Sequence, residues 1–403
     1  MAGVVALSLA ITSSFAAADR QAPTGDGPHF YMTAAEVGQL RTNVLKRGHP
    51  WATAAWAHTR TVANEALGTG PQPAEPGRNY TNKGTGDCGD GDDGWFDCLY
   101  APGRVDGLRV LALAQAYAIT RQSEYGDKAR QYLVRWSQDY YPPSAQVGHA
   151  VSEPVGIALK AFMAYDLARD RLTPAERTQF RAWAKKLSEI GRQRVDDYMD
   201  HPWIPEAPYG NSATWSRALA VLGAGVAGGA YLQDTLRWNW AHKTPNGKDG
   251  GWRDLIDGAI ETRAGRMTEE RIRSSIDYGL FTWHGLALIA DAARRVGYNR
   301  DLFTATTSGK NLLLVSSYYE PYLTKLRPSP HDEAAARGGA DFDAALGGYR
   351  AASELAYRNH PTSRVLQRIV NYGGASTRGA NYDVHITGFN GVTGGVLAPK
   401  TRR

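Results

Sequence analysis

The chain has 403 residues, of which 42% are hydrophobic and 21% are charged, and its formal net charge is +6. This composition is typical of a globular protein with one large or two medium domains. The mild basic excess fits an anionic partner, but the basic residues are dispersed rather than gathered in a run, which argues against nucleic acid.

The chain starts with an apolar segment, residues 2–18, that ends in the small residues Ala16, Ala17 and Ala18. An apolar stretch followed by small residues is typical of a secretory signal and its cleavage site. We therefore expect export to the extracellular space or the periplasm, with a mature chain that begins near Asp19. The segment is too short for a good transmembrane span, and no other apolar run reaches that length.

Two cysteines, Cys88 and Cys98, lie in a loop rich in Gly and Asp. In an exported protein such a pair predicts one local disulfide. The aspartates of the loop leave calcium as an alternative, but their order does not match the EF-hand pattern. We therefore expect a disulfide, and neither a metal nor a cofactor.

Helical periodicity dominates the chain, and two capping boxes mark helix starts at Thr33–Glu36 and Thr173–Glu176. Short, weak strand patterns occur only near the end, at residues 384–386 and 392–396. The expected helices are residues 33–47, 50–67, 104–121, 125–138, 152–169, 174–196, 212–230, 233–242, 254–263, 269–297, 342–358 and 362–371.

Many of these helices follow one another across short Gly, Pro or Asn turns, as in antiparallel hairpins. No sequence repeat of fixed length is present, which excludes a solenoid of the tetratricopeptide type. The pattern predicts an all-α fold, an (α/α) toroid or incomplete α/α barrel, as one domain over residues 19–403. Residues 68–103 and 200–211 are long irregular segments of the kind that form binding loops.

Residues 268–297 are the most informative part of the chain. They read as one long helix with Thr268 as its N-cap and two glutamates in its first turn. Arg271 and Tyr278 are seven residues apart and therefore share a helix face. This pair suits the removal of a proton beside a carboxylate, because the arginine can neutralise the acid and the tyrosine can move the proton.

A loop rich in aromatic residues and proline, residues 200–211, precedes the helix that carries Trp215. Asn211 is in an N-cap position, where it can cap the helix or donate to a substrate carboxylate. Trp203, Tyr209 and Trp215 can stack on sugar rings or belong to the core, and Trp215, which lies inside the helix, fits the core equally well.

The segment Gly210-Asn211-Ser212-x-x-Trp215, followed by the Arg271–Tyr278 helix, resembles the alginate lyase-like polysaccharide lyases, which include alginate and glucuronan lyases with α/α toroid folds. In that family, an Asn-Asn-His-x-x-Trp segment supplies an asparagine and a histidine, and a later helix supplies an arginine and, seven residues on, the catalytic tyrosine. The likeness covers roughly residues 105–320 and includes Tyr132-Leu133-x-x-Trp136, Leu172-Thr173-Pro174 and the segment 286–290.

The chain departs from the family pattern at Ser212, which stands where the family has its histidine. His201, His149 and His284 are the candidates to replace it, and His149 could line the cleft together with Glu153. Arg273 competes with Arg271 for the substrate carboxylate. We expect Arg271 to neutralise the carboxylate, and Arg273 to form an ion pair with Asp277 at i,i+4.

The resemblance implies β-elimination on an acidic polysaccharide by a secreted enzyme that we expect to be monomeric. Asn211 and Arg271 would neutralise the uronate carboxylate, and Tyr278 would act as base and then as acid. Without a certain histidine, polymannuronate or a glucuronan is the expected substrate. Two alternatives remain open: a glycoside hydrolase using two of Asp257, Glu261 and Asp277, and a carbohydrate-binding protein without catalytic activity.

Overall fold

The structure is a computed structural model that describes residues 29–72, 101–139, 157–261, 263–305, 308–332 and 339–383, together with Gly388 and Asn390. Over these residues, the regular structure is helical, and the only β pairing consists of isolated bridges. The expected strands, both cysteines, His149 and Glu153 lie outside the described residues, as do the first 28 residues with the expected signal.

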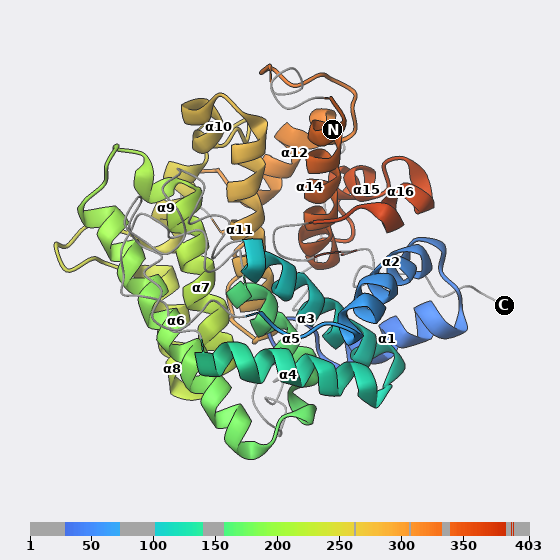
Figure 1. The fold of residues 1–403 in the computed structure, drawn as a ribbon. Coiled ribbons are helices and arrows are strands. Elements are labelled where there is room, and N and C mark those ends of the chain that lie inside the picture. The colour runs from blue at the N-terminus through green and yellow to red at the C-terminus, as the bar shows by residue number, and fades with distance from the viewer. Residues whose placement is uncertain are drawn as a thin grey trace, which may run out of the picture.

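The helices and their bounds follow in chain order (Figure 1). They are α1 (Ala34–Arg41) with the π-helical turn Thr42–Lys46, α2 (Pro50–Leu67), α3 (Ala101–Thr120), α4 (Ser123–Asp139), α5 (Leu159–Ala168), α6 (Pro174–Asp200), α7 (Asn211–Ala227), α8 (Gly229–Ala241), α9 (Trp252–Ala259), α10 (Thr268–Arg273), α11 (Ile276–Arg295), α12 (Leu312–Leu323), α14 (Gly339–Asn359), α15 (Arg364–Val370) and α16 (Gly374–Ala380).

The helices form two layers, as expected for an incomplete α/α toroid. The inner helices α3, α5, α7, α11 and α14 pack against one another in that order, while α4 and α6 cover them from outside. Every residue of α5 is buried, and α7 and α11 are buried almost throughout. Helices buried on every side lie inside the fold, whereas α6 buries only one face.

The inner helices run in the same direction. On α11 and α14, Asp277 accepts a hydrogen bond from Tyr349, and fourteen residues later Asp291 accepts one from Asn359. The helices α5, α6 and α7 are joined as successive hairpins, with α6 antiparallel to α7. The N-terminal ends of the inner helices therefore gather at one end of the toroid, where the loop 200–211 also lies.

Most predicted helices are confirmed, and α2 has the predicted bounds. Both capping boxes are present, with Glu36 and Glu176 reaching back to the cap residues. Two helices, α12 and α16, are absent from the prediction. None of the described helices combines the length and the apolar character needed to cross a bilayer.

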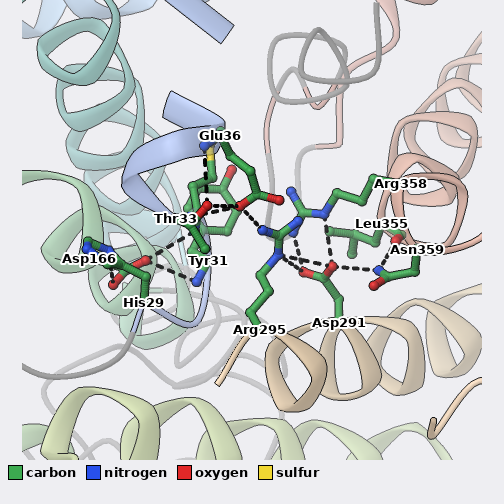
Figure 2. A network of polar contacts seen from close by, with 11 residues as sticks. His29, Tyr31, Thr33, Glu36, Asp166, Asp291, Arg295, Leu355, Arg358 and Asn359 are labelled. Carbon is green, nitrogen blue, oxygen red and sulfur yellow. Dashed lines mark hydrogen bonds and ion pairs between the residues drawn. The ribbon is translucent and has the colours of Figure 1, made fainter. Parts of the chain in front are cut away.

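A buried polar network ties the ends of three elements together (Figure 2). Asp291 of α11 accepts hydrogen bonds from Arg358 Nε at 2.9 Å and Asn359 Nδ2 at 2.7 Å, and pairs with Arg295 at 3.2 Å. Arg295 in turn pairs with Glu36 of α1. Burial alone would raise the pKa of Asp291, but the two arginines outweigh it, so the pKa lies below its usual value.

A second part of the network fixes the segment before α1. Asp166 of α5 accepts hydrogen bonds from the backbone N–H groups of Tyr31 at 3.0 Å and Met32 at 3.2 Å, and it pairs with His29 at 3.2 Å. These contacts satisfy backbone donors that no helix serves, because they precede the first helix.

Close contact between α6 and α7 depends on Gly191. A Cβ atom there would lie 2.5 Å from Ser216 O and 2.8 Å from Ala220 N, both backbone atoms that cannot move independently. We expect Gly191→Ala to lower the free energy of unfolding by about 1–3 kcal/mol, measured by chemical denaturation. The matched control is Gly38→Ala at an exposed position of α1, where a Cβ meets nothing within 4 Å. An equal loss in both variants would contradict this account.

Candidate functional site

The segment predicted as one helix is broken in two. Helix α10 ends at Arg273, Ser274 is left-handed (φ 49°, ψ 45°), and the extended Ser275 is the N-cap of α11. The prediction of a single helix over residues 268–297 is therefore wrong. Serine side chains compete with the helical backbone for hydrogen bonds, which makes this pair a tolerable place for an interruption. A left-handed residue other than glycine stores strain of the kind often found at functional sites.

The break brings Arg273 next to Tyr278. The Arg273 guanidinium lies over the Tyr278 ring at 5.3 Å and over the Trp203 ring at 5.6 Å. Both distances are within the range of cation–π attraction. Arg273 also pairs with Glu269 at 3.4 Å, four residues before it rather than after it. Trp203 is 62% exposed, so this stack opens to solvent.

Arg271, the arginine favoured from the sequence, points to other partners. It pairs with Glu206 at 2.9 Å and with Glu261 at 2.7 Å. Its hydrogen bond lowers the pKa of Glu206. Arg271 thus joins the loop 200–211, the segment after α9 and helix α10. The structure brings Arg273, not Arg271, to the predicted catalytic tyrosine.

Asn211 is the first residue of α7, and the N-cap is Gly210, so the predicted N-cap is off by one residue. The Asn211 side chain caps nothing. Its Nδ2 donates to Glu269 Oε1 at 3.0 Å, and its Oδ1 accepts from Ser212 Oγ at 3.1 Å. The side chain therefore joins α7 to Glu269 of α10 instead of capping its own helix.

Asn211 and Arg273 line one pocket, which lies between the end of α6, the loop 200–211, the N-terminal end of α7 and helix α10. Tyr278 lies beside Arg273 but is not among the described residues that line this pocket. Partial positive charge at the N-terminus of α7 favours an anionic ligand, and Arg273 adds a positive charge that its ion pair with Glu269 offsets in part. No histidine is among the described residues that line the pocket. They are Tyr198, Trp203, Ile204, Ala207, Gly210, Asn211, Ser212, Glu269, Ile272 and Arg273.

The other predicted aromatic residues differ in their surroundings. Trp215 is fully buried against Phe281 and His284, with ring distances of 4.9 and 5.4 Å, so it belongs to the core and cannot stack on a sugar. Tyr209 is half-buried near α9, where its hydroxyl donates to Asp254 at 3.4 Å. Burial and the neighbouring Asp254 raise the pKa of Tyr209.

Neither described histidine candidate lines the pocket. His201 is exposed at the C-cap of α6, where its backbone N–H donates to Asp197 O. His284 is fully buried and pairs with Asp383 at 3.3 Å. Burial lowers the pKa of His284, which favours a neutral core side chain.

Sequence reasoning missed the roles of two buried carboxylates, treating Glu269 and Glu270 only as charges in a first helical turn. Glu269 reaches the pocket. Glu270 faces the opposite side and accepts hydrogen bonds from Tyr319 at 2.7 Å and from His331 at 3.1 Å. Tyr319 belongs to α12, and without that helix in the prediction no sequence signal indicated the contact.

The carboxylates considered for a hydrolase have structural partners. Asp277 accepts a hydrogen bond from Tyr349 at 2.7 Å, Glu261 pairs with Arg271, and Asp257 accepts one from Ser308. These contacts join neighbouring elements of the fold. They do not form a pair of carboxylates facing each other across the pocket described above.

Comparison with known proteins identifies the family of the chain. The sequence model of the family described as "Alginate lyase" matches residues 103–328. Among solved structures, the chain is similar to an alginate lyase from Bacteroides ovatus, with 13% identity, coverage of 88% of this chain and 98% of that one, and a TM-score of 0.60.

It is also similar to alginate lyase A1-III from Sphingomonas species A1, with 15% identity, coverage of 90% and 96%, and a TM-score of 0.55. A histidine-to-alanine variant of alginate lyase A1-III, complexed with a tetrasaccharide, gives 16% identity, coverage of 87% and 97%, and a TM-score of 0.53. At these identities the structural likeness shows the fold. No curated protein sequence matches the chain.

Proposed function

Since the chain belongs to the alginate lyase family and is a polysaccharide lyase, we propose that it cleaves polymannuronate, the mannuronate part of alginate, or a glucuronan by β-elimination. The observation that carries the proposal is the stack of Trp203, Arg273 and Tyr278 beside Asn211. It combines an exposed ring for a sugar, a cation and an amide for a carboxylate, and a tyrosine for proton transfer.

In the proposed reaction, the uronate carboxylate binds to Arg273 and Asn211. Neutralising it stabilises the enolate-like intermediate that forms when the C5 proton leaves. Tyr278, as phenolate, takes the C5 proton. The C5–H electron pair then forms the C4–C5 double bond as the C4–O bond breaks. Tyr278 returns its proton to the departing oxygen, so it ends as it began.

The choice between uronates follows from stereochemistry. In mannuronate and glucuronate, the C5 proton and the C4 oxygen leave from one side of the ring, so one tyrosine can serve both. In guluronate they leave from opposite faces, and a second group is needed. Ser212 stands at the family's histidine position, and the pocket lining described above includes no histidine, which supports the one-tyrosine route.

The activity test measures ultraviolet absorbance of the unsaturated uronate during incubation with polymannuronate, polyguluronate, glucuronan and pectate. We expect a rise with polymannuronate or glucuronan. A rise with polyguluronate alone would overturn the stereochemical assignment. Reducing ends that appear without any absorbance rise would overturn elimination altogether.

The two arginines give a paired prediction. We expect Arg273→Ala to lower kcat/KM by about 100-fold, because a charged contact to the substrate is lost, and Arg273→Lys to restore only part of it, because lysine lacks the planar fork. Arg271→Ala removes the ion pairs that join the loop 200–211 to α10, and it should lower kcat/KM by less than about 10-fold. Steady-state kinetics on the preferred polymer measures both losses. A larger loss of kcat/KM for Arg271→Ala than for Arg273→Ala would show that Arg271 binds the substrate carboxylate.

Export, the mature start near Asp19, the Cys88–Cys98 disulfide and the monomeric state remain predictions from the sequence. Amino-terminal sequencing of the secreted protein tests the first two together. Mass measurement with and without reduction tests the disulfide.

A further inference from the structure

We propose that Glu269 is the positioning residue of this site: its carboxylate holds the Asn211 amide and the Arg273 guanidinium in the arrangement that receives a uronate carboxylate. The inference rests on the proposed function, and it assigns to Glu269 a role that acts through Asn211 and Arg273.

One carboxylate oxygen joins the two groups. Glu269 Oε1 accepts from Asn211 Nδ2 at 3.0 Å and lies 3.4 Å from Arg273 Nε. Asn211 comes from α7, whereas Glu269 and Arg273 come from α10. The side chain of Glu269 is only 8% exposed, so water competes little for these contacts and they are stronger than at the surface.

The contacts leave donors for a ligand. The Asn211 amide has two N–H groups, of which Glu269 takes one, and its oxygen accepts from Ser212 Oγ at 3.1 Å. Turning the amide over would set its oxygen against the Glu269 carboxylate, so its orientation is fixed. Arg273 carries five N–H donors in a planar fork. Glu269 takes the donor on Nε, and those on the Nη atoms suit a planar carboxylate.

Gly210 supports the same conclusion independently. A Cβ atom at residue 210 would lie 2.4 Å from Glu269 Oε2. The backbone there is extended (φ −85°, ψ −176°) and needs no glycine for its conformation. The absence of a side chain at this position therefore makes room for the Glu269 carboxylate, directly before Asn211.

The charge of Glu269 matters to the arrangement. Burial raises the pKa of Glu269, and Arg273 opposes this only in part. Arg273 of α10 is the charged group that faces it, and Asn211 of α7 adds a neutral donor. As the pH falls through this raised pKa, Glu269 takes up a proton and loses its ion pair with Arg273. Ligand binding should weaken over the same interval.

The experiment uses a Tyr278→Phe protein, so that substrate is bound but not consumed, and titrates it with a short mannuronate oligomer in a calorimeter. Adding Glu269→Ala should raise Kd by about 10- to 100-fold through loss of charge-assisted hydrogen bonds. Glu269→Gln should fall between, because its amide oxygen still accepts from Asn211. The matched control, Glu189→Gln, changes an exposed glutamate paired with Lys185 on outer helix α6 and should leave Kd unchanged.

The pH dependence of Kd shows whether Glu269 positions the ligand-binding groups or only stabilises the fold. With Glu269 present, Kd should rise toward acid pH, and with Glu269→Gln that rise should disappear. Unchanged Kd values in both variants, or the same pH dependence with glutamine, would overturn the inference. A wild-type protein that eliminates no uronate polymer would instead overturn the proposed function, so the two failures are distinguishable.

Discussion

Replacing Tyr278 by phenylalanine is expected to lower the elimination rate by about 10²- to 10⁴-fold, the usual contribution of general acid–base catalysis. The ring would remain beneath Arg273, so oligosaccharide binding should survive. Initial rates from ultraviolet absorbance and calorimetric binding, measured on the same preparation, separate the two effects.

The matched control is Tyr231→Phe, which removes a hydroxyl that donates to Ser188 on the outer helices. It should retain the wild-type rate. If Tyr278→Phe retained that rate as well, another group would have to be the base, and the one-tyrosine scheme would fail.

Replacing Asp291 by alanine should lower the free energy of unfolding by about 3–5 kcal/mol, because buried Arg358 and Arg295 lose a shared counter-ion. Chemical denaturation at neutral pH measures the loss. The control, Asp234→Ala, breaks an exposed pair with Arg192 and should cost less than about 1 kcal/mol.

The effect of Asp291→Ala on stability should depend on pH. The folded-state pKa of Asp291 lies below its ordinary value of 3.8. Its ionic contribution is therefore fully present above that value and is lost as the pH falls through the lower folded-state pKa. The difference in the free energy of unfolding between the wild type and Asp291→Ala should therefore become smaller in strong acid. If this difference did not change with pH, the lost packing of the side chain, and not its charge, would explain the lower stability.

Local signals predicted much of the fold. The capping boxes at Thr33 and Thr173 and the periodicity of α2 are properties of short segments, so the sequence alone revealed them. Helix α12 was not predicted, because Pro321 lies in its interior and its apolar and aromatic residues do not fall on one face at helical spacing. Its N-cap, Asn311, satisfies the first backbone donors and starts the helix nonetheless.

The site was harder to predict for one reason. Periodicity assumes an unbroken helix, and the left-handed Ser274 changes which arginine faces Tyr278. The residue types were foreseen, but their partners depend on the loop 200–211 and on α12, which are distant in sequence. The buried position of Glu269 follows from Asn211 and Gly210 across the pocket, and no local pattern encodes it.

The contact between the two ends of the described chain bears on how the protein is made. Arg378 of α16 lies over the ring of Trp51 in α2 at 3.9 Å, and Glu36 pairs with Arg295 across 259 positions of sequence. The first described helices, α1 and α2, pack on α3 early in the chain, but part of their surface is covered only by helices close to its end. Such non-local topology slows folding and prolongs exposure of apolar surface.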